Sequence, residues 1–382
     1  MPEAHDKPQG VSRRDFLRRG SAGIVGVGAA MAAVPAGLLA GEAEPKIESR
    51  NKQPGLRYTV LGRAGWEVSR LGFGGFALTA ANRGVLEAAI ERGVNLFHIA
   101  RSYVGGQAIK AAGPVIKANR DKLFLVIKGE PDQEIDNDLR TLGVEMADIV
   151  MPQIESAEQA ARPDRVEQFL KLQQAGKVRK LGLTAHSQMA AVVGAGMKVD
   201  DVVLIMTRYE AAARNELDPR LKLARERRIG TMAMKVFLGI DDHSLYPATL
   251  KDLYARGQID LALLTPRNHE ELDAWLKVVG ELPDRAEIDA LNHYMACHLG
   301  EMCTGCGACQ GCPQGIRIGD ILRYSRYYAA QCGDLETARE LYRTIAADRT
   351  APGCRDCGRC ERVCPNHVPV RQFLRDAHRA LA

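Results

Sequence analysis

The sequence of 382 residues predicts an α/β fold, in which a (β/α)8 or TIM barrel is followed by a small α-helical, cysteine-rich domain. Short apolar strands alternate with helical stretches eight times between residues 71 and 265. Eight of the ten cysteines fall in two tight groups after residue 300, and no cysteine precedes Cys297. Because composition changes there, we predict a boundary between Leu282 and Asn292, with the barrel at 55–285 and the second domain at 293–382.

Each predicted barrel strand is short and mainly apolar. Continuous runs such as Leu123 to Ile127 are typical of parallel strands that are buried on both faces, and helical patterns such as 83–92 and 164–175 lie between them. An open doubly wound sheet would have a similar pattern but usually has fewer units. The eight strands are expected at Leu71 to Ala77, Asn95 to Ala100, Leu123 to Lys128, Asp148 to Gln153, Lys180 to Ala185, Asp201 to Thr207, Gly230 to Phe237 and Asp260 to Thr265.

A further segment precedes the first of these strands. The stretch from Tyr58 to Arg70 has Gly62 and Gly65 between two short extended segments, which indicates a β-hairpin. We expect this hairpin to close the floor of the barrel.

The two cysteine groups have the spacing of iron-sulfur ligands. The second group has the pattern C-x2-C-x2-C-x3-C-P, which holds a [4Fe-4S] cluster in bacterial ferredoxins, and the first has C-x2-C-x2-C-x2-C-P. The sequence therefore predicts a ferredoxin-like domain with two [4Fe-4S] clusters. The predicted ligands are Cys303, Cys306, Cys309, Cys312, Cys354, Cys357, Cys360 and Cys364.

By analogy with two-cluster ferredoxins, the fourth cysteine of each group would serve the other cluster. Cys364 would then join the first three cysteines of the first group, and Cys312 the first three of the second. A non-crossed arrangement stays open, because the first group has only two residues before its last cysteine.

Zinc and disulfides are the alternatives to clusters. Three consecutive short gaps suit a cluster better than one tetrahedral ion, and neighbouring C-x2-C pairs bridge poorly without strain. Cys297 and Cys332 lie outside the pattern, and we expect both to be small buried side chains rather than ligands.

The N-terminus predicts export. Ser12-Arg13-Arg14-Asp15-Phe16-Leu17 precedes a mildly apolar stretch from Gly20 to Ala40, which is typical of a twin-arginine signal over residues 1–43. Glycines and Pro35 dilute this stretch, so a permanent membrane anchor is the weaker interpretation. The route carries folded proteins, which suits clusters inserted before export. We therefore predict a periplasmic or otherwise exported protein.

Charge and composition exclude some classes of partner. The formal charge is +5, but basic residues are interspersed with acidic ones, and no aromatic-interleaved basic stripe indicates nucleic-acid binding. Beyond the N-terminal stretch, no other apolar run is long enough to span a membrane. The expected partners are a small-molecule substrate and a redox protein or other electron carrier.

The motifs Tyr58-Thr-Val-Leu-Gly62, Val68-Ser-Arg-Leu-Gly72-Phe-Gly74 and Gly93-Val-Asn-Leu-Phe97 resemble the aldo/keto reductase family. The resemblance covers about residues 55–380 and is closest to the branch with a C-terminal ferredoxin-like extension. It implies a barrel with NADP(H) across its C-terminal mouth and an Asp, Tyr, Lys and His tetrad that reduces a carbonyl.

Only half of that tetrad is present. Tyr103 and Lys128 stand at the family's Tyr and Lys positions, whereas His98 replaces the Asp and Gln153 replaces the His. Lys128 can still lower the pKa of Tyr103, and Gln153 can donate a hydrogen bond but cannot exchange a proton. Pro152 lacks an amide hydrogen and should interrupt strand pairing next to Gln153.

The expected cofactor positions also match in part. By the same resemblance, Tyr209 would stack on a nicotinamide, Thr184 stands where the family has a Ser, and Arg267 would hold a phosphate. Because barrel enzymes keep their chemistry at the carboxyl ends of strands, His186, Arg208 and Lys235 are further candidates for the mouth.

These features predict an exported iron-sulfur oxidoreductase, in which the barrel binds a small carbonyl or polar substrate and two clusters relay electrons. The alternative is a non-catalytic electron-transfer protein with a degenerate barrel as its scaffold, which His98 and Gln153 favour. Tyr103, Lys128 and Tyr209 favour the enzyme.

Overall fold

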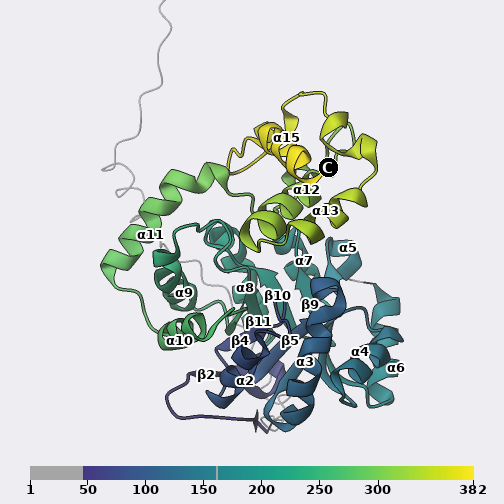
Figure 1. Ribbon diagram of the computed structural model, residues 1–382, viewed down its shortest axis with the longest axis vertical. Coiled ribbons are helices and arrows are strands. Elements are labelled where there is room, and N and C mark those ends of the chain that lie inside the picture. The colour runs from purple at the N-terminus through teal and green to yellow at the C-terminus, as the bar shows by residue number, and fades with distance from the viewer. Residues whose placement is uncertain (1–45, 161) are drawn as a thin grey trace, which may run out of the picture. The chain divides into compact units, whose positions relative to one another are not determined.

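The computed structural model describes residues 46–160 and 162–382, and the predicted signal over residues 1–43 lies outside them. Eight parallel strands pair in the order β4-β5-β6-β7-β9-β10-β11-β12, and β12 pairs with β4, so that the sheet closes into a barrel (Figure 1). The predicted (β/α)8 barrel is confirmed. The barrel strands are β4 (Leu71–Gly74), β5 (Leu96–Ala100), β6 (Phe124–Lys128), β7 (Ala147–Met151), β9 (Val178–Ala185), β10 (Val202–Arg208), β11 (Gly230–Met234) and β12 (Leu261–Leu264).

Helices follow the strands because their apolar faces need the sheet for burial. The side chains between sheet and helices form one apolar cluster, which includes Phe97, Ile127 and Leu221. These helices are α2 (Arg83–Glu91), α3 (Gln107–Ala118), α4 (Glu134–Leu142), α5 (Ala157–Ala160), α6 (Pro163–Gln174), α7 (Met189–Gly196), α8 (Arg214–Glu226), α9 (Tyr246–Ala255) and α10 (His269–Val278).

One strand is interrupted where the sequence predicts it. β7 ends at Met151, and a two-residue strand, β8 (Gln153–Ile154), resumes after Pro152. Because proline cannot donate a ladder hydrogen bond, the chain bends here before Gln153 rejoins the sheet beside Thr184.

The barrel floor is closed by the predicted hairpin. β2 (Tyr58–Leu61) pairs antiparallel with β3 (Trp66–Ser69), and β1 (Glu48–Ser49) pairs with β3. Leu61, Trp66 and Val68 pack against inward-facing barrel residues, and the Trp66 ring stacks on Phe124 with centroids 5.0 Å apart. This apolar cluster seals the floor.

A network of ion pairs surrounds the floor. The carboxylate of Asp148 is fully buried and contacts the guanidinium groups of Arg50, Arg120 and Arg179 at 3.2, 2.7 and 2.9 Å. It also accepts a hydrogen bond from the Leu125 amide at 2.8 Å. Every oxygen of this buried carboxylate is therefore satisfied.

The C-terminal part has its own small apolar core. Ile321, Leu322, Tyr342, Leu374 and Leu381 are buried in it. Its elements are α11 (Arg285–His298), α12 (Ile318–Leu322), the π-helix η8 (Arg323–Gln331), α13 (Leu335–Arg343), α14 (Arg359–Arg362) and α15 (Val370–Leu381).

Helix α11 runs through the predicted domain boundary, and the described residues from 46 to 382 cluster as one compact unit. The division at 285 and 293 stays a prediction. Within the described residues, no helix is long and apolar enough to span a membrane.

Candidate functional site

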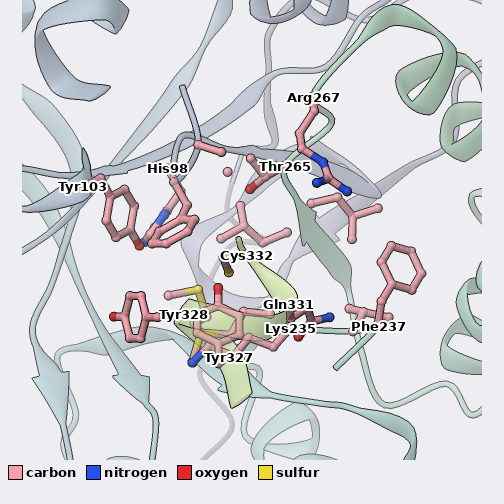
Figure 2. A pocket seen from close by; sticks show the side chains of 18 of the residues that line it. His98, Tyr103, Lys235, Phe237, Thr265, Arg267, Tyr327, Tyr328, Gln331 and Cys332 are labelled. Carbon is pink, nitrogen blue, oxygen red and sulfur yellow. The ribbon is translucent and has the colours of Figure 1, made fainter. Parts of the chain in front are cut away.

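A cavity of about 180 Å³ lies at the mouth of the barrel. Strand ends and the segments after them provide one wall, including His98, Lys128 and Thr265. Figure 2 shows Tyr327, Tyr328 and Gln331 of the C-terminal domain across the cavity from His98 and Thr265. The C-terminal domain therefore completes the site, and the barrel alone does not enclose it.

Three of the four predicted catalytic residues line this cavity: His98, Tyr103 and Lys128. The Lys128 ammonium lies 5.2 Å from the centroid of the Tyr103 ring, and the His98 and Tyr103 ring centroids are 6.0 Å apart. Gln153 is not part of the lining, but its Oε1 accepts a hydrogen bond from Lys128 Nζ at 3.1 Å. The sequence thus predicted a set of residues that the fold brings together.

His98 is 1% exposed, and both of its ring nitrogens lack a hydrogen-bond partner within the described residues. Burial and the Lys128 ammonium lower the pKa of His98 to about 3. The imidazole is therefore neutral at physiological pH and cannot replace an orienting carboxylate. A buried, unpartnered imidazole on a cavity wall is available to a ligand.

Burial and Tyr328 raise the pKa of Tyr103, so its hydroxyl stays protonated at physiological pH. Burial and the Arg323 guanidinium lower the pKa of Lys128 to about 8. Lys128 therefore changes charge close to neutral pH, which suits proton exchange. The lowered tyrosine pKa that the residue types suggested does not occur, because burial raises the pKa of Tyr103.

A chain of polar contacts connects Lys128 to the C-terminal domain. Gln153 Nε2 donates to Glu155, and the Glu155 carboxylate pairs with Arg323 of η8 at 3.1 Å. Although burial opposes its charge, Glu155 and Asp320 raise the pKa of Arg323. The position of η8 is thus coupled to the position of the Lys128 side chain.

Of the predicted cofactor residues, only Arg267 lines the cavity. Tyr209 is fully buried in the core, and its hydroxyl donates to Asp218. Thr184 is also fully buried, with Oγ1 3.4 Å from His186 Nδ1. A nicotinamide therefore cannot stack on Tyr209 in this arrangement, and these residues do not fit NADP(H) as the family holds it.

The C-terminal wall of the cavity was missed in the sequence. None of residues 318–347 is among the candidate mouth residues that the sequence indicates. The predicted burial of Cys332 and Cys297 is wrong, because Cys332 is half-buried and lines the cavity and Cys297 is exposed on α11. A run of tyrosines at 324, 327 and 328 was the available signal, because such rings favour cavity walls.

The eight cysteines of the two groups line two neighbouring cavities. One contains Cys303, Cys306, Cys309 and Cys364. The other contains Cys354, Cys357, Cys360, Cys312 and again Cys309. Each is lined by at least four cysteines, which is the number of ligands that a [4Fe-4S] cluster requires, so the number of donors fits such a cluster. All ten cysteines of this described region are free thiols.

The first cysteine cavity borders the barrel mouth. His186 lines both this cavity and the cavity of the mouth. Arg208 donates to the carbonyl oxygen of Cys303 at 2.9 Å, and a Cβ at Gly305, whose φ is +65°, would collide with the Arg208 guanidinium. Glycine at 305 thus lets the cysteine loop lie directly on the strand ends.

Burial raises the pKa of the thiols at Cys303 and Cys309, the latter to about 12. Without metal these sulfurs are neutral, whereas metal ligation requires thiolates. Metal binding in these cavities therefore releases protons.

Comparison with known proteins gives separate matches for the barrel and for the cysteine-rich C-terminal domain. Residues 70–239 match the aldo/keto reductase family, and residues 302–369 match a 4Fe-4S dicluster domain. The second match favours iron-sulfur over zinc or disulfides.

Solved structures share the barrel. An aldo-keto reductase from Bacillus halodurans, in its holo form, has 18% sequence identity and a TM-score of 0.54, over 63% of this chain and 96% of its own. An aldo-keto reductase from Klebsiella pneumoniae in complex with NADPH has 18% identity and a TM-score of 0.51, over 64% of this chain and 95% of its own. At this identity the likeness shows the fold alone. Residues 70–239 thus form an aldo/keto reductase-family segment with an oxidoreductase fold, and residues 302–369 of the same chain form a 4Fe-4S dicluster domain.

Proposed function

We propose that this protein is an exported iron-sulfur oxidoreductase that interconverts a small carbonyl compound and its alcohol at the barrel mouth. It exchanges electrons with a carrier protein through two [4Fe-4S] clusters. The observation that carries the proposal is the position of His186, which lines both the mouth cavity and the first cysteine cavity. The two cavities therefore share a wall residue, which brings a substrate site next to a cluster site.

The division of the cysteines supports the crossed arrangement. Cys364 lies with the first three cysteines of the first group, and Cys312 with the first three of the second. Cys309 borders both cavities, so the two sites adjoin. When bound, each [4Fe-4S] cluster accepts or donates one electron, so two clusters hold the two electrons that the reaction needs.

The residues of the mouth handle the protons. Reduction replaces the C=O π bond by one C–H and one O–H bond, and it consumes two electrons and two protons. The Tyr103 hydroxyl, which stays protonated, donates to the carbonyl oxygen, and the Lys128 ammonium beside it is the second proton source. Alcohol oxidation reverses these transfers. No step requires NADP(H), for which Tyr209 and Thr184 do not fit.

The test uses anaerobically purified, iron-loaded protein. Its clusters are reduced with dithionite, the excess reductant is removed, and the protein is mixed with a panel of small aldehydes, ketones and oxo acids. We expect at least one compound to restore the visible absorbance of the oxidised clusters, with stoichiometric alcohol formation, and Tyr103→Phe to slow this without changing iron content.

Reoxidation no faster than in buffer for every compound would contradict the enzyme and support the electron-transfer alternative. In that case an oxidised carrier protein would still reoxidise the clusters at full rate, and Tyr103→Phe would have no effect.

Export is proposed from the twin-arginine motif alone. Residues 1–45 fused to a folded reporter are expected to deliver it outside the cytoplasm in a bacterium with the twin-arginine pathway. Replacing Arg13 and Arg14 by lysine should block delivery. Delivery that persists in this variant would contradict the assignment.

A further inference from the structure

The mouth cavity has an unusual charge pattern. Lys128, Lys235 and Arg267 line it together with His98 and His186, and no Asp or Glu side chain of the described residues does. Buried cations are normally paired with carboxylates, because an uncompensated charge is costly to desolvate. A cavity wall with cations alone is therefore complementary to an anion.

Lys235 is the clearest case. Its ammonium has no hydrogen bond or ion pair with the rest of the described chain, and it lies 3.7 Å from the centroid of the Tyr327 ring. The backbone of Lys235 has a φ of 57°, a left-handed conformation that is strained for a residue with a side chain. Such strain at the end of a barrel strand is typical of a functional position.

Lys128 has a single neutral partner, the Gln153 side chain, because the nearby Glu155 is paired with Arg323. Arg267 differs, since it is 57% exposed and lies 3.5 Å from Glu271. It therefore marks the outer part of the cavity, whereas Lys128 and Lys235 are the inner cations.

The mouth cavity is distinct from the cavities that the predicted cluster ligands line. None of the eight predicted cluster ligands lines the mouth cavity, and Arg208 and Arg359 line the cysteine cavities instead. Both inner lysines line the mouth cavity, and Lys235 also borders a second cavity that Glu210, Asp241, Glu301 and Cys303 line.

The rest of the wall is mainly aromatic. Phe76, Phe237, Tyr246 and Trp275 line the cavity, and the Phe237 and Tyr246 rings stack with centroids 3.9 Å apart. Such a wall binds a flat or apolar group well and offers it few hydrogen bonds. The ligand therefore needs an anionic group and an apolar body.

We propose that the substrate is a small carboxylic acid with an aromatic or apolar body, whose carboxylate binds at Lys128 and Lys235. The identity of the reacting group rests on the proposed function, but the preference for a carboxylate does not. The carboxylate would lie on the Lys128 side of the cavity, where Tyr103 can reach a carbonyl on the neighbouring carbon. A 2-oxo acid or 2-hydroxy acid has this geometry.

A bound carboxylate also changes the protonation of the site. Burial and neighbouring cations hold the pKa of Lys235 well below its usual value. An anion favours the charged form of both lysines, so binding takes up protons from solution. Proton uptake is measurable without turnover.

The test is calorimetric titration of the iron-loaded protein with pyruvate, phenylglyoxylate and phenylpyruvate, each beside its primary amide, and with inorganic phosphate. We expect at least one acid to bind at least about tenfold more tightly than its amide, with proton uptake seen as a buffer-dependent heat. Lys235→Gln should remove most of this preference and leave amide binding unchanged. Lys222→Gln, on the exposed face of α8, is the matched control and should behave as wild type.

Equal binding of every acid and its amide would overturn the proposal, as would phosphate binding more tightly than any acid. So would an acid preference that Lys235→Gln and Lys128→Gln leave intact. Failure of the proposed function is separate: an acid would bind with the predicted preference, yet reduced clusters would not be reoxidised by it.

Discussion

The two ends of the barrel are both closed, but by opposite chemistry. At the floor, Asp148 is surrounded by Arg50, Arg120 and Arg179, so this buried carboxylate is fully paired. At the mouth, Lys235 contacts the Tyr327 ring but has no carboxylate partner among the described residues, and both ring nitrogens of His98 lack a hydrogen-bond partner there. The paired charges of the floor stabilise the fold. The mouth instead has polar groups without a partner, which a bound ligand can contact.

The largest effect is expected from a variant that removes a reacting group at the mouth without changing the packing around it. Tyr103→Phe removes the proton donor and keeps the ring, which contacts Phe76 at a centroid distance of 5.2 Å. We expect substrate-dependent cluster reoxidation to fall about 10²–10⁴-fold, with substrate affinity nearly unchanged. Stopped-flow absorbance measures the rate. An unchanged rate would remove Tyr103 from the reaction.

At the floor, Trp66→Ala should destabilise the protein by about 3–5 kcal/mol, because the ring is 2% exposed and its loss leaves a cavity. Carboxylate binding at the mouth should not change. The comparison variant Tyr327→Ala removes a ring that faces the mouth cavity, and we expect it to weaken binding with a smaller loss of stability. Urea unfolding of the iron-loaded protein measures the stability of the two variants. Equal destabilisation would contradict the proposed difference between floor and mouth.

Removing a charged group should change the stability of the protein differently at the two ends of the barrel. Asp148→Asn leaves three guanidinium groups without their buried carboxylate, and we expect a loss of about 3 kcal/mol. Lys235→Met removes a buried cation that contacts the Tyr327 ring, and it breaks no ion pair among the described residues, so stability should stay the same or rise by about 1 kcal/mol. A comparable loss of stability in Lys235→Met would mean that this lysine is structural.

The pH dependence of carboxylate binding tests whether the charge of Lys128 contributes to it. Its pKa is lowered to about 8, so the ammonium is charged below this pH and neutral above it. Carboxylate affinity should therefore fall as pH rises through 8, by up to about tenfold per pH unit. In Lys128→Arg the cation stays charged, and the fall should become shallower. An affinity that is independent of pH from 7 to 9 would contradict the role of Lys128.

The smallest expected effect concerns nicotinamide. Because Tyr209 and Thr184 are buried away from the cavity, NADPH should neither bleach the oxidised clusters nor compete with a bound carboxylate. Anaerobic absorbance and competition titration measure the two. Rapid cluster reduction by NADPH would show that the mouth opens to admit a dinucleotide.

The sequence predicted the barrel, the floor hairpin and the break at Pro152, because these depend on local patterns of apolar residues, glycine and proline. It also identified His98, Tyr103 and Lys128, since strand ends of a closed barrel converge. It did not predict that Tyr209 would be buried, because a family position does not fix a side-chain direction.

The cover over the mouth could not be predicted either. Tyr327, Tyr328 and Cys332 reach the cavity only because η8 packs on the strand ends, which is a tertiary contact with no local signal. The crossed grouping of the cysteines also depends on a tertiary contact, since about forty residues separate the two groups, and the sequence predicted it only by analogy with two-cluster ferredoxins.

Helix η8 belongs to the same folded segment as the cysteine loops, because its Tyr324 is buried in the core on which Cys303 and Cys364 also pack. We therefore expect maturation and substrate recognition to be linked. A chain that has not received its iron should hold this wall of the mouth cavity less firmly and bind substrate more weakly.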